Sequence, residues 1–317
     1  TLNMMTSVLV GLLLAQLHYG FDQGVRLDYG STVVFNGFIP VLGGYEGEVV
    51  VDMGLAVDGL DRTDPNEQRA ANEITSLNIK FNGAKLPLET SDVQTYFPRT
   101  TISLLPDGKI TKTDAPDIAL PVRLPGLDVK RFPDITYVPV QFPTGDLAVG
   151  ATWSYKKKFG DSEVDYDCTL KGLEGDKATI GVSISQDYEL LEDSALQVVK
   201  DEQDAENRVK TKMTGTGTVV FDTKDGYVVS ADMTTDAVSD VTHIVDGTKS
   251  QRDLKTTFKL VLKTPQSPPK PKDGGWLDHA WQTVSTTASV LWENARSSWA
   301  ALKVAISLLP WLGGRPR

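Results

Sequence analysis

Apolar and polar residues alternate with a period of two along most of the chain. In residues 49–57, Val49, Val51, Met53, Leu55 and Val57 fall on one face of a strand, and Asp52 falls on the other. The same alternation recurs in residues 77–82, 180–185 and 257–263. A period of two is typical of β-strands, and one dry face with one wet face favours antiparallel over doubly covered parallel sheets. The pattern predicts a mainly β fold of curved antiparallel sheets.

Turn residues separate these runs at regular intervals. Asp107-Gly108 and Asp225-Gly226 each divide two apolar runs, and Asp-Gly supplies the positive φ that hairpin turns need. The order strand, Asp-Gly turn, strand and acidic end occurs in both 100–114 and 217–232. This order indicates a loose duplication, although any two hairpins of a β protein share some of it. We therefore predict two similar β-rich halves, with the boundaries 21–114 and 146–263.

A proline-rich connector, residues 115–145, joins the predicted halves. Because proline cannot donate to a sheet ladder, the segment is expected to be a sheet edge, an extended connector or a domain boundary. Apolar residues such as Phe132 and Tyr137 are interleaved with the prolines, so the connector is expected to pack on the rest of the protein. Its prolines are Pro116, Pro121, Pro125, Pro133, Pro139 and Pro143.

Residues 4–17 form a short apolar segment near the beginning of the chain. It is shorter than the roughly 20 residues of a membrane-spanning helix and has the length of a secretory signal core. We predict a signal segment over 1–20, with cleavage near Ala15, and hence export to a periplasm, cell envelope or extracellular space. Two features weaken this prediction. No basic residue precedes the segment, and Leu13 occupies the position before the cleavage point where a small residue is expected. The alternative is a buried N-terminal strand or helix.

The period changes near the end of the chain, after a proline-rich tether at 264–275. From residue 276 onward, apolar residues recur at three- and four-residue steps, which predicts a long amphipathic helix over 276–312. Residues 264–317 contain six cations against three anions in a chain of net charge −10. Most of the chain's six tryptophans lie in this segment: Trp276, Trp281, Trp292, Trp299 and Trp311.

Two interpretations of this C-terminal segment stay open. Tryptophan favours the boundary between headgroups and acyl chains, and cations favour anionic lipid, so the segment is predicted to attach to a membrane surface. Alternatively, it docks on a protein partner or on the acidic body. A membrane-spanning helix is disfavoured because Glu293 and Arg296 interrupt every apolar window of sufficient length. The predicted contact residues are the five tryptophans together with Arg296 and Lys303.

Candidate chemistry is sparse. The excess of acidic residues argues against a nucleic-acid partner. The single cysteine, Cys168, shares the apolar face of its strand and is interpreted as a core residue. The acidic row Asp161, Glu163, Asp165 and Asp167 is interpreted as a solvated face that Lys156, Lys157 and Lys158 pair with across a hairpin. His243 is interpreted as structural. We predict a nonenzymatic protein without a catalytic, cofactor or metal site.

Three segments resemble exported bacterial β domains and the lipoprotein-carrier group. They are GATWSY at 150–155, the hairpin at 162–184 and TVVFDTKDGYVVSAD at 218–232. The resemblance implies a carrier whose curved sheet shelters an apolar ligand, and it assigns no ligand-contacting residues. The alternative function is a structural or assembly subunit of an envelope complex. An apolar cavity between the sheet and the connector would favour the carrier, and a filled core would favour the subunit.

Overall fold

A computed structural model of the chain describes residues 14–39, 44–85, 93, 97–115, 131–159 and 162–266. Short strands at the beginning of the chain and in its middle alternate with long ones. The strands of the first part are β1 (Leu14–Gln16), β2 (Arg26–Ile39), β3 (Tyr45–Gly59), β4 (Gln68–Phe81), β5 (Ala84–Lys85), β6 (Thr100–Leu104) and β7 (Ile110–Asp114). Those of the second part are β8 (Asp146–Ala148), β9 (Thr152–Phe159), β10 (Ser162–Glu174), β11 (Lys177–Glu192), β12 (Val198–Val199), β13 (Asn207–Asp222), β14 (Tyr227–His243) and β15 (Lys249–Gln266).

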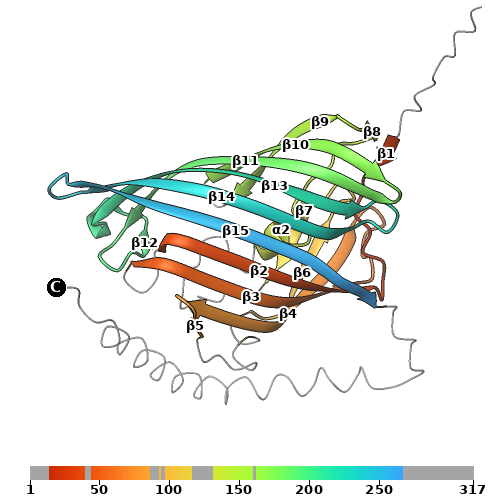
Figure 1. The fold of residues 1–317 in the computed structure, drawn as a ribbon, viewed down its shortest axis with the longest axis horizontal. Helices are drawn as coiled ribbons and strands as arrows, with labels where there is room; N and C mark the ends of the chain where they lie inside the picture. Colours follow the sequence, from red (N-terminus) through yellow and green to blue (C-terminus); the bar gives the residue numbers. More distant parts are fainter. Residues whose placement is uncertain are drawn as a thin grey trace, which may run out of the picture. The chain divides into compact units, whose positions relative to one another are not determined.

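A single 13-stranded antiparallel sheet dominates the described residues (Figure 1). Its strands follow the order β7-β6-β4-β3-β2-β15-β14-β13-β11-β10-β9, with β5 beside β4 and β12 beside β11. The short strands β1 and β8 pair separately, through Ala15 and Leu147 among others. Neighbouring strands are mostly consecutive in sequence, which is the expected outcome of hairpin connections.

The prediction of curved sheets in two similar halves is wrong, because the two parts share one sheet. The first long strand, β2, pairs with the last, β15, in a register that runs from Leu254 opposite Gly37 to Gln266 opposite Arg26. This pairing satisfies the backbone groups that would otherwise line two open sheet edges. Alternation assigns residues to faces and gives no information about which distant strand is the neighbour.

The predicted long helix would make the fold α+β overall, and the described residues do not support it either. They contain the one-turn helix α2 (Phe132–Ile135), the 3-10 turn η1 (Glu202–Asp204) and one further helical residue, Val93. In this described part, no helix is long and apolar enough to cross a membrane. The segment 276–312, for which the helix was predicted, lies outside the described residues. One compact unit ends at Pro268.

The predicted faces and turns are confirmed in the sheet. Val49, Val51 and Val57 are fully buried on its inner face, whereas Asp52 lies on the outer face. Gly108 and Gly226 adopt positive φ values of 89° and 76° in the turns between β6 and β7 and between β13 and β14. Asp-Gly turns therefore form where the sequence predicts them.

The core lies between the inner face of the sheet and a strap formed by residues 131–142, the described part of the connector. Phe132, Tyr137 and Phe142 of the strap are buried against the sheet. Tyr19 joins them from the chain before β2, and its ring lies 5.1 Å from that of Phe142 and 5.1 Å from that of Phe221. The described part of the connector thus packs on the sheet.

Candidate functional site

Side chains from β9 fasten the strap to the inner face. The strap is irregular and buried, so its carbonyl groups need donors from outside a regular ladder. Trp153 Nε1 donates to the Gln141 carbonyl at 2.8 Å, and the Tyr155 hydroxyl donates to the Pro139 carbonyl at 3.3 Å. Lys157 Nζ donates to the Val138 carbonyl at 3.1 Å. Alternate residues of one strand thus satisfy successive parts of the strap.

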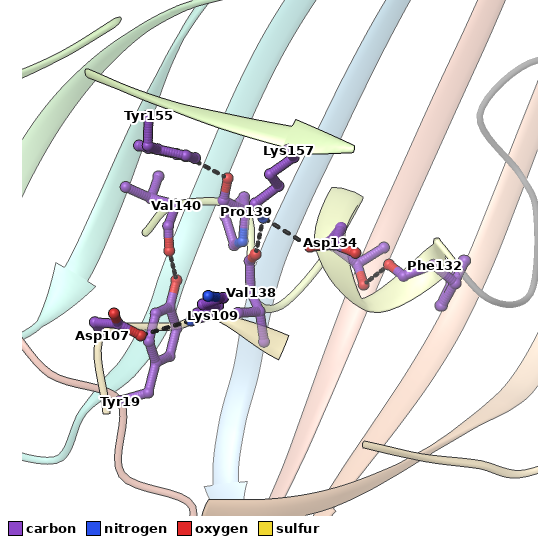
Figure 2. Close-up of polar contacts among 11 residues, drawn as sticks. Tyr19, Asp107, Lys109, Phe132, Asp134, Val138, Pro139, Val140, Tyr155 and Lys157 are labelled. Atoms are coloured by element: carbon purple, nitrogen blue, oxygen red, sulfur yellow. Dashed lines mark hydrogen bonds and ion pairs between the residues drawn. The ribbon is translucent and has the colours of Figure 1, made fainter. Parts of the chain in front are cut away.

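Lys157 is the charged member of this group and is buried with Asp134. Its side chain is 4% exposed, and Nζ lies 2.8 Å from Asp134 Oδ1 (Figure 2). Burial lowers the pKa of the Lys157 ammonium below its ordinary value, and the Asp134 carboxylate opposes this shift. The structure therefore corrects the interpretation of Lys157 as a surface residue. Lys156 does point outward and pairs with Asp165 at 2.9 Å.

Buried tyrosines lie within the strap and around it, and they keep their protons. The Tyr19 hydroxyl donates to the Val140 carbonyl at 2.9 Å, as Figure 2 shows, and the rings of Tyr155 and Tyr166 stack 4.7 Å apart. Burial raises the pKa of each of these phenols, since the phenolate would lose its hydration. We call this set the inner tyrosines; its members are Tyr19, Tyr29, Tyr137, Tyr155 and Tyr166.

Cys168 lies on the inner face of β10, and its side chain faces the core. The residue is 2% exposed, and burial raises the pKa of its thiol to about 12. A thiol with this pKa is almost entirely protonated at neutral pH, so it lacks the thiolate needed for nucleophilic chemistry. Its burial confirms the interpretation of Cys168 as a core residue.

The outer face of the sheet is polar, and on these strands the sign of its charge alternates from one strand to the next. Glu163 and Asp165 of β10 lie on this face, where both contact Lys156 of β9. Along the centre of the sheet, lysines of β13 and β15 flank aspartates of β14, and Lys259 pairs with Asp232 at 3.5 Å. Charge of this kind keeps a face hydrated and discourages edge pairing.

The inner face of the four long central strands, β11, β13, β14 and β15, has a different composition. Apart from His243 at the rim, its inward positions carry one carboxylate, Glu192, and one guanidinium, Arg252, in the part that the structure describes. The remaining inward positions are apolar, small or uncharged polar residues. Two faces of the same strands therefore differ sharply in charge.

A half-buried apolar area lies in the middle of this inner face, and we call it the inner strip. Its residues are Ile184, Met213, Gly215, Met233, Ala237 and Leu254, and the uncharged polar residues Thr235 and Thr256 lie among them. Ile184, Met233 and Leu254 continue the core outward from the strap. The Met233 sulfur occupies the space that a side chain at Gly217 would need. Methionine is unbranched and flexible, so this cover can move with little strain.

An ion pair lies across the end of the inner strip that is far from the strap. Glu192 Oε2 and Arg252 Nη1 are 2.7 Å apart, with the side chains 5% and 16% exposed. Glu192 ends β11 and Arg252 lies in β15, so the pair spans the intervening strands β13 and β14. The guanidinium also stacks on the Phe38 ring at 4.4 Å. Beneath the pair, Val241 and Thr211 are buried.

The predicted contact residues of the C-terminal segment are not among those that the structure describes. Trp276, Trp281, Trp292, Trp299, Trp311, Arg296 and Lys303 all lie outside the described residues. His243 sits at the turn after β14, with Nδ1 2.8 Å from Asp246, whose pKa falls to about 2 chiefly through backbone hydrogen bonding from Thr248. In the described part of the chain, no group of three or more His, Cys, Asp and Glu side chains is placed to hold a metal.

Sequence reasoning missed the inward roles of Lys157, Glu192 and Arg252. The sequence does indicate the inward position of Lys157, because Trp153, Tyr155 and Lys157 share one face of an alternating strand. The alternation of β15 likewise places Arg252 on the face of Leu254 and Phe258. The pairing of these charges with Asp134 and Glu192 had no signal, because each partner comes from a different part of the chain.

Comparisons with known proteins find similarity among solved structures only. No protein-family model matches the chain, and a search of curated proteins gives no match. A solved structure titled "Lipid-protein interactions in lipovitellin" aligns at a TM-score of 0.44 and 13% identity. The alignment covers 81% of this chain and 27% of that one, so this chain spans about a quarter of the lipovitellin chain.

Proposed function

We propose that the protein is a nonenzymatic binding protein that holds an apolar ligand against the inner strip. The observation that carries the proposal is the contrast between the two faces of β11, β13, β14 and β15. The outer face is densely charged, whereas the inner strip is uncharged, half-buried and continuous with the core. Ligand sites are mostly apolar with a few placed polar groups, and this is the composition of the inner strip and its end.

The strap defines which part of the inner face is available. Residues 131–142 fill the space beneath one end of the sheet, with Tyr137, Val138 and Val140 fully buried. A ligand at that end would have to displace the hydrogen bonds that Tyr155 and Lys157 make to the strap. The inner strip lies beyond this packing, and Met233 and Met213 give it a surface that adapts to its occupant.

Binding of diphenylhexatriene, a neutral apolar probe that fluoresces out of water, tests the proposal. Ala237 and Val238 are adjacent in β14 and face opposite sides of the sheet. Ala237→Trp fills the inner strip and is expected to abolish probe binding. Val238→Trp adds the same side chain to the outer face and is expected to leave binding unchanged. Equal binding by both variants, each shown to unfold cooperatively, or no binding by the wild-type chain, would overturn the proposal.

The filled space beneath the strap favours a second candidate, a structural or assembly subunit. A core without room for a ligand is what such a subunit requires. In that case the wild-type chain would fail to bind the probe. Mixed with an extract of cell envelopes, it would sediment as part of a larger complex.

Export belongs to the same proposal. It rests on the apolar segment at 4–17 together with the position of the core. Leu17, Tyr19 and Phe21 are buried, and Tyr19 holds the strap, so removal of a leader near Ala15 would spare all three. The same cleavage would divide β1, in which Ala15 pairs with Leu147. Mass spectrometry of the chain recovered from outside the cytoplasm would give the cleavage point. Cleavage after Leu17, or no export, would contradict this part.

A further inference from the structure

We propose that the ligand of the inner strip is a single-chain lipid with an uncharged polar head, and that the Glu192–Arg252 pair contacts this head. The inference rests on the proposed function and adds the chemical class of the ligand. It follows from three properties of the pair: its place at the end of the strip, its unused donors and its neutral total charge.

The place of the pair gives the ligand a polar end. Arg252 and Leu254 are successive inward residues of β15, so the guanidinium lies next to the inner strip. From Arg252 to Phe258 the strand extends about 20 Å, at roughly 3.3 Å per residue. This length suits an extended long alkyl chain lying along β15. At the other end, Phe258 borders the closed core.

The guanidinium has hydrogen-bonding capacity left. Among the described residues, its one side-chain hydrogen bond is from Nη1 to Glu192, and its plane rests on Phe38. A guanidinium carries five N–H donors in a fixed plane. A hydroxyl or carbonyl oxygen at the end of the strip would accept from these donors. A bare alkyl chain would leave them without a partner.

Charge decides between a neutral and an acidic head. Glu192 is 4% exposed and already neutralises Arg252. A carboxylate placed beside the pair would leave a net negative charge in a buried site, which is strongly unfavourable. No second cation faces the inner strip from β11, β13, β14 or β15 in their described residues. An alcohol or an ester head adds no charge and satisfies the free donors.

Tetradecanol and tetradecanoate share one alkyl chain and differ in the head, so they separate the two classes. Displacement of diphenylhexatriene from the full chain at neutral pH is expected to favour tetradecanol by about tenfold. Glu192→Gln leaves the Arg252 charge uncompensated and is expected to raise the affinity for tetradecanoate at least tenfold. The double variant Glu192→Gln/Arg252→Gln is uncharged and is expected to restore the preference for the alcohol.

The outcomes separate the two proposals. If diphenylhexatriene does not bind, the proposed function itself is wrong. If it binds but wild type, Glu192→Gln and the double variant show the same ratio of alcohol to carboxylate affinity, the pair does not contact the head and this inference is wrong. A wild-type preference for tetradecanoate would also overturn it. If Glu192→Gln folds poorly, Arg252→Gln decides the test instead, because it leaves the Glu192 carboxylate uncompensated and is expected to increase the preference for the alcohol; an unchanged ratio would overturn the inference.

Discussion

Replacing Lys157 by methionine tests whether the strap is held by a buried charge pair. Methionine keeps the length and apolar stem of lysine and removes the ammonium. The variant leaves Asp134 without its cation and the Val138 carbonyl without its donor. Breaking a buried pair by removing one partner costs about 3–5 kcal/mol. Asp134 keeps 18% side-chain exposure, so we expect a loss near the lower end, about 3 kcal/mol.

Lys156→Met is the matched control. Lys156 is the preceding residue of β9, its side chain is 62% exposed, and it pairs with Glu163 and Asp165 on the outer face. Exposed pairs of this kind contribute little because water and salt screen them. Urea unfolding followed by circular dichroism gives the free energy of unfolding for both variants. We expect a clear shift of the midpoint for Lys157→Met and a much smaller one for Lys156→Met.

A second substitution separates charge from packing. In Lys157→Met/Asp134→Leu the unpaired carboxylate is also removed, so the double variant is expected to be more stable than Lys157→Met alone. If Lys157→Met costs no more than Lys156→Met, the charge pair does not hold the strap. If the double variant is less stable than the single one, packing of the strap rather than its charge accounts for the loss.

Four other outcomes are expected. Burial raises the pKa of the inner tyrosines above the unfolded value of 10, so their contribution to the free energy of unfolding is fully present below pH 10 and is lost as the pH rises further. Tyrosinate absorbance should therefore appear together with unfolding, and gradual ionisation in the folded state would contradict this. Cys168 should react with thiol reagents only as fast as the protein opens, and labelling at the rate of a free thiol would show that it is accessible. Gly59→Ala would place a Cβ against the Asp22 carbonyl and should lower the melting temperature, whereas Gly172→Ala meets open space and should not; equal effects would refute the close approach. Flotation with anionic liposomes tests the predicted membrane attachment, with the full chain compared against a chain that ends at Pro268 and so keeps all of β15. The prediction is wrong if neither chain floats.

The sequence by itself determined which residues face the core. The alternation of Val49, Val51 and Val57 predicted the inner face of β3, and the Asp-Gly pairs predicted the turns at Gly108 and Gly226. These features are local, because side chains alternate across any strand and a tight turn needs positive φ wherever it occurs. The same local rule applied to β9 would have placed Lys157 inside.

The tertiary structure alone decided how the strands join and which polar groups meet. The pairing of β2 with β15 merges the two predicted halves into one sheet, and the strap obtains donors from Tyr19 and Tyr155. The Glu192–Arg252 pair joins residues separated by two strands of the sheet. Such contacts depend on the curvature and register of the whole sheet, and local patterns carry no record of either. The inner strip and its charged end therefore become visible only once the strands are assembled.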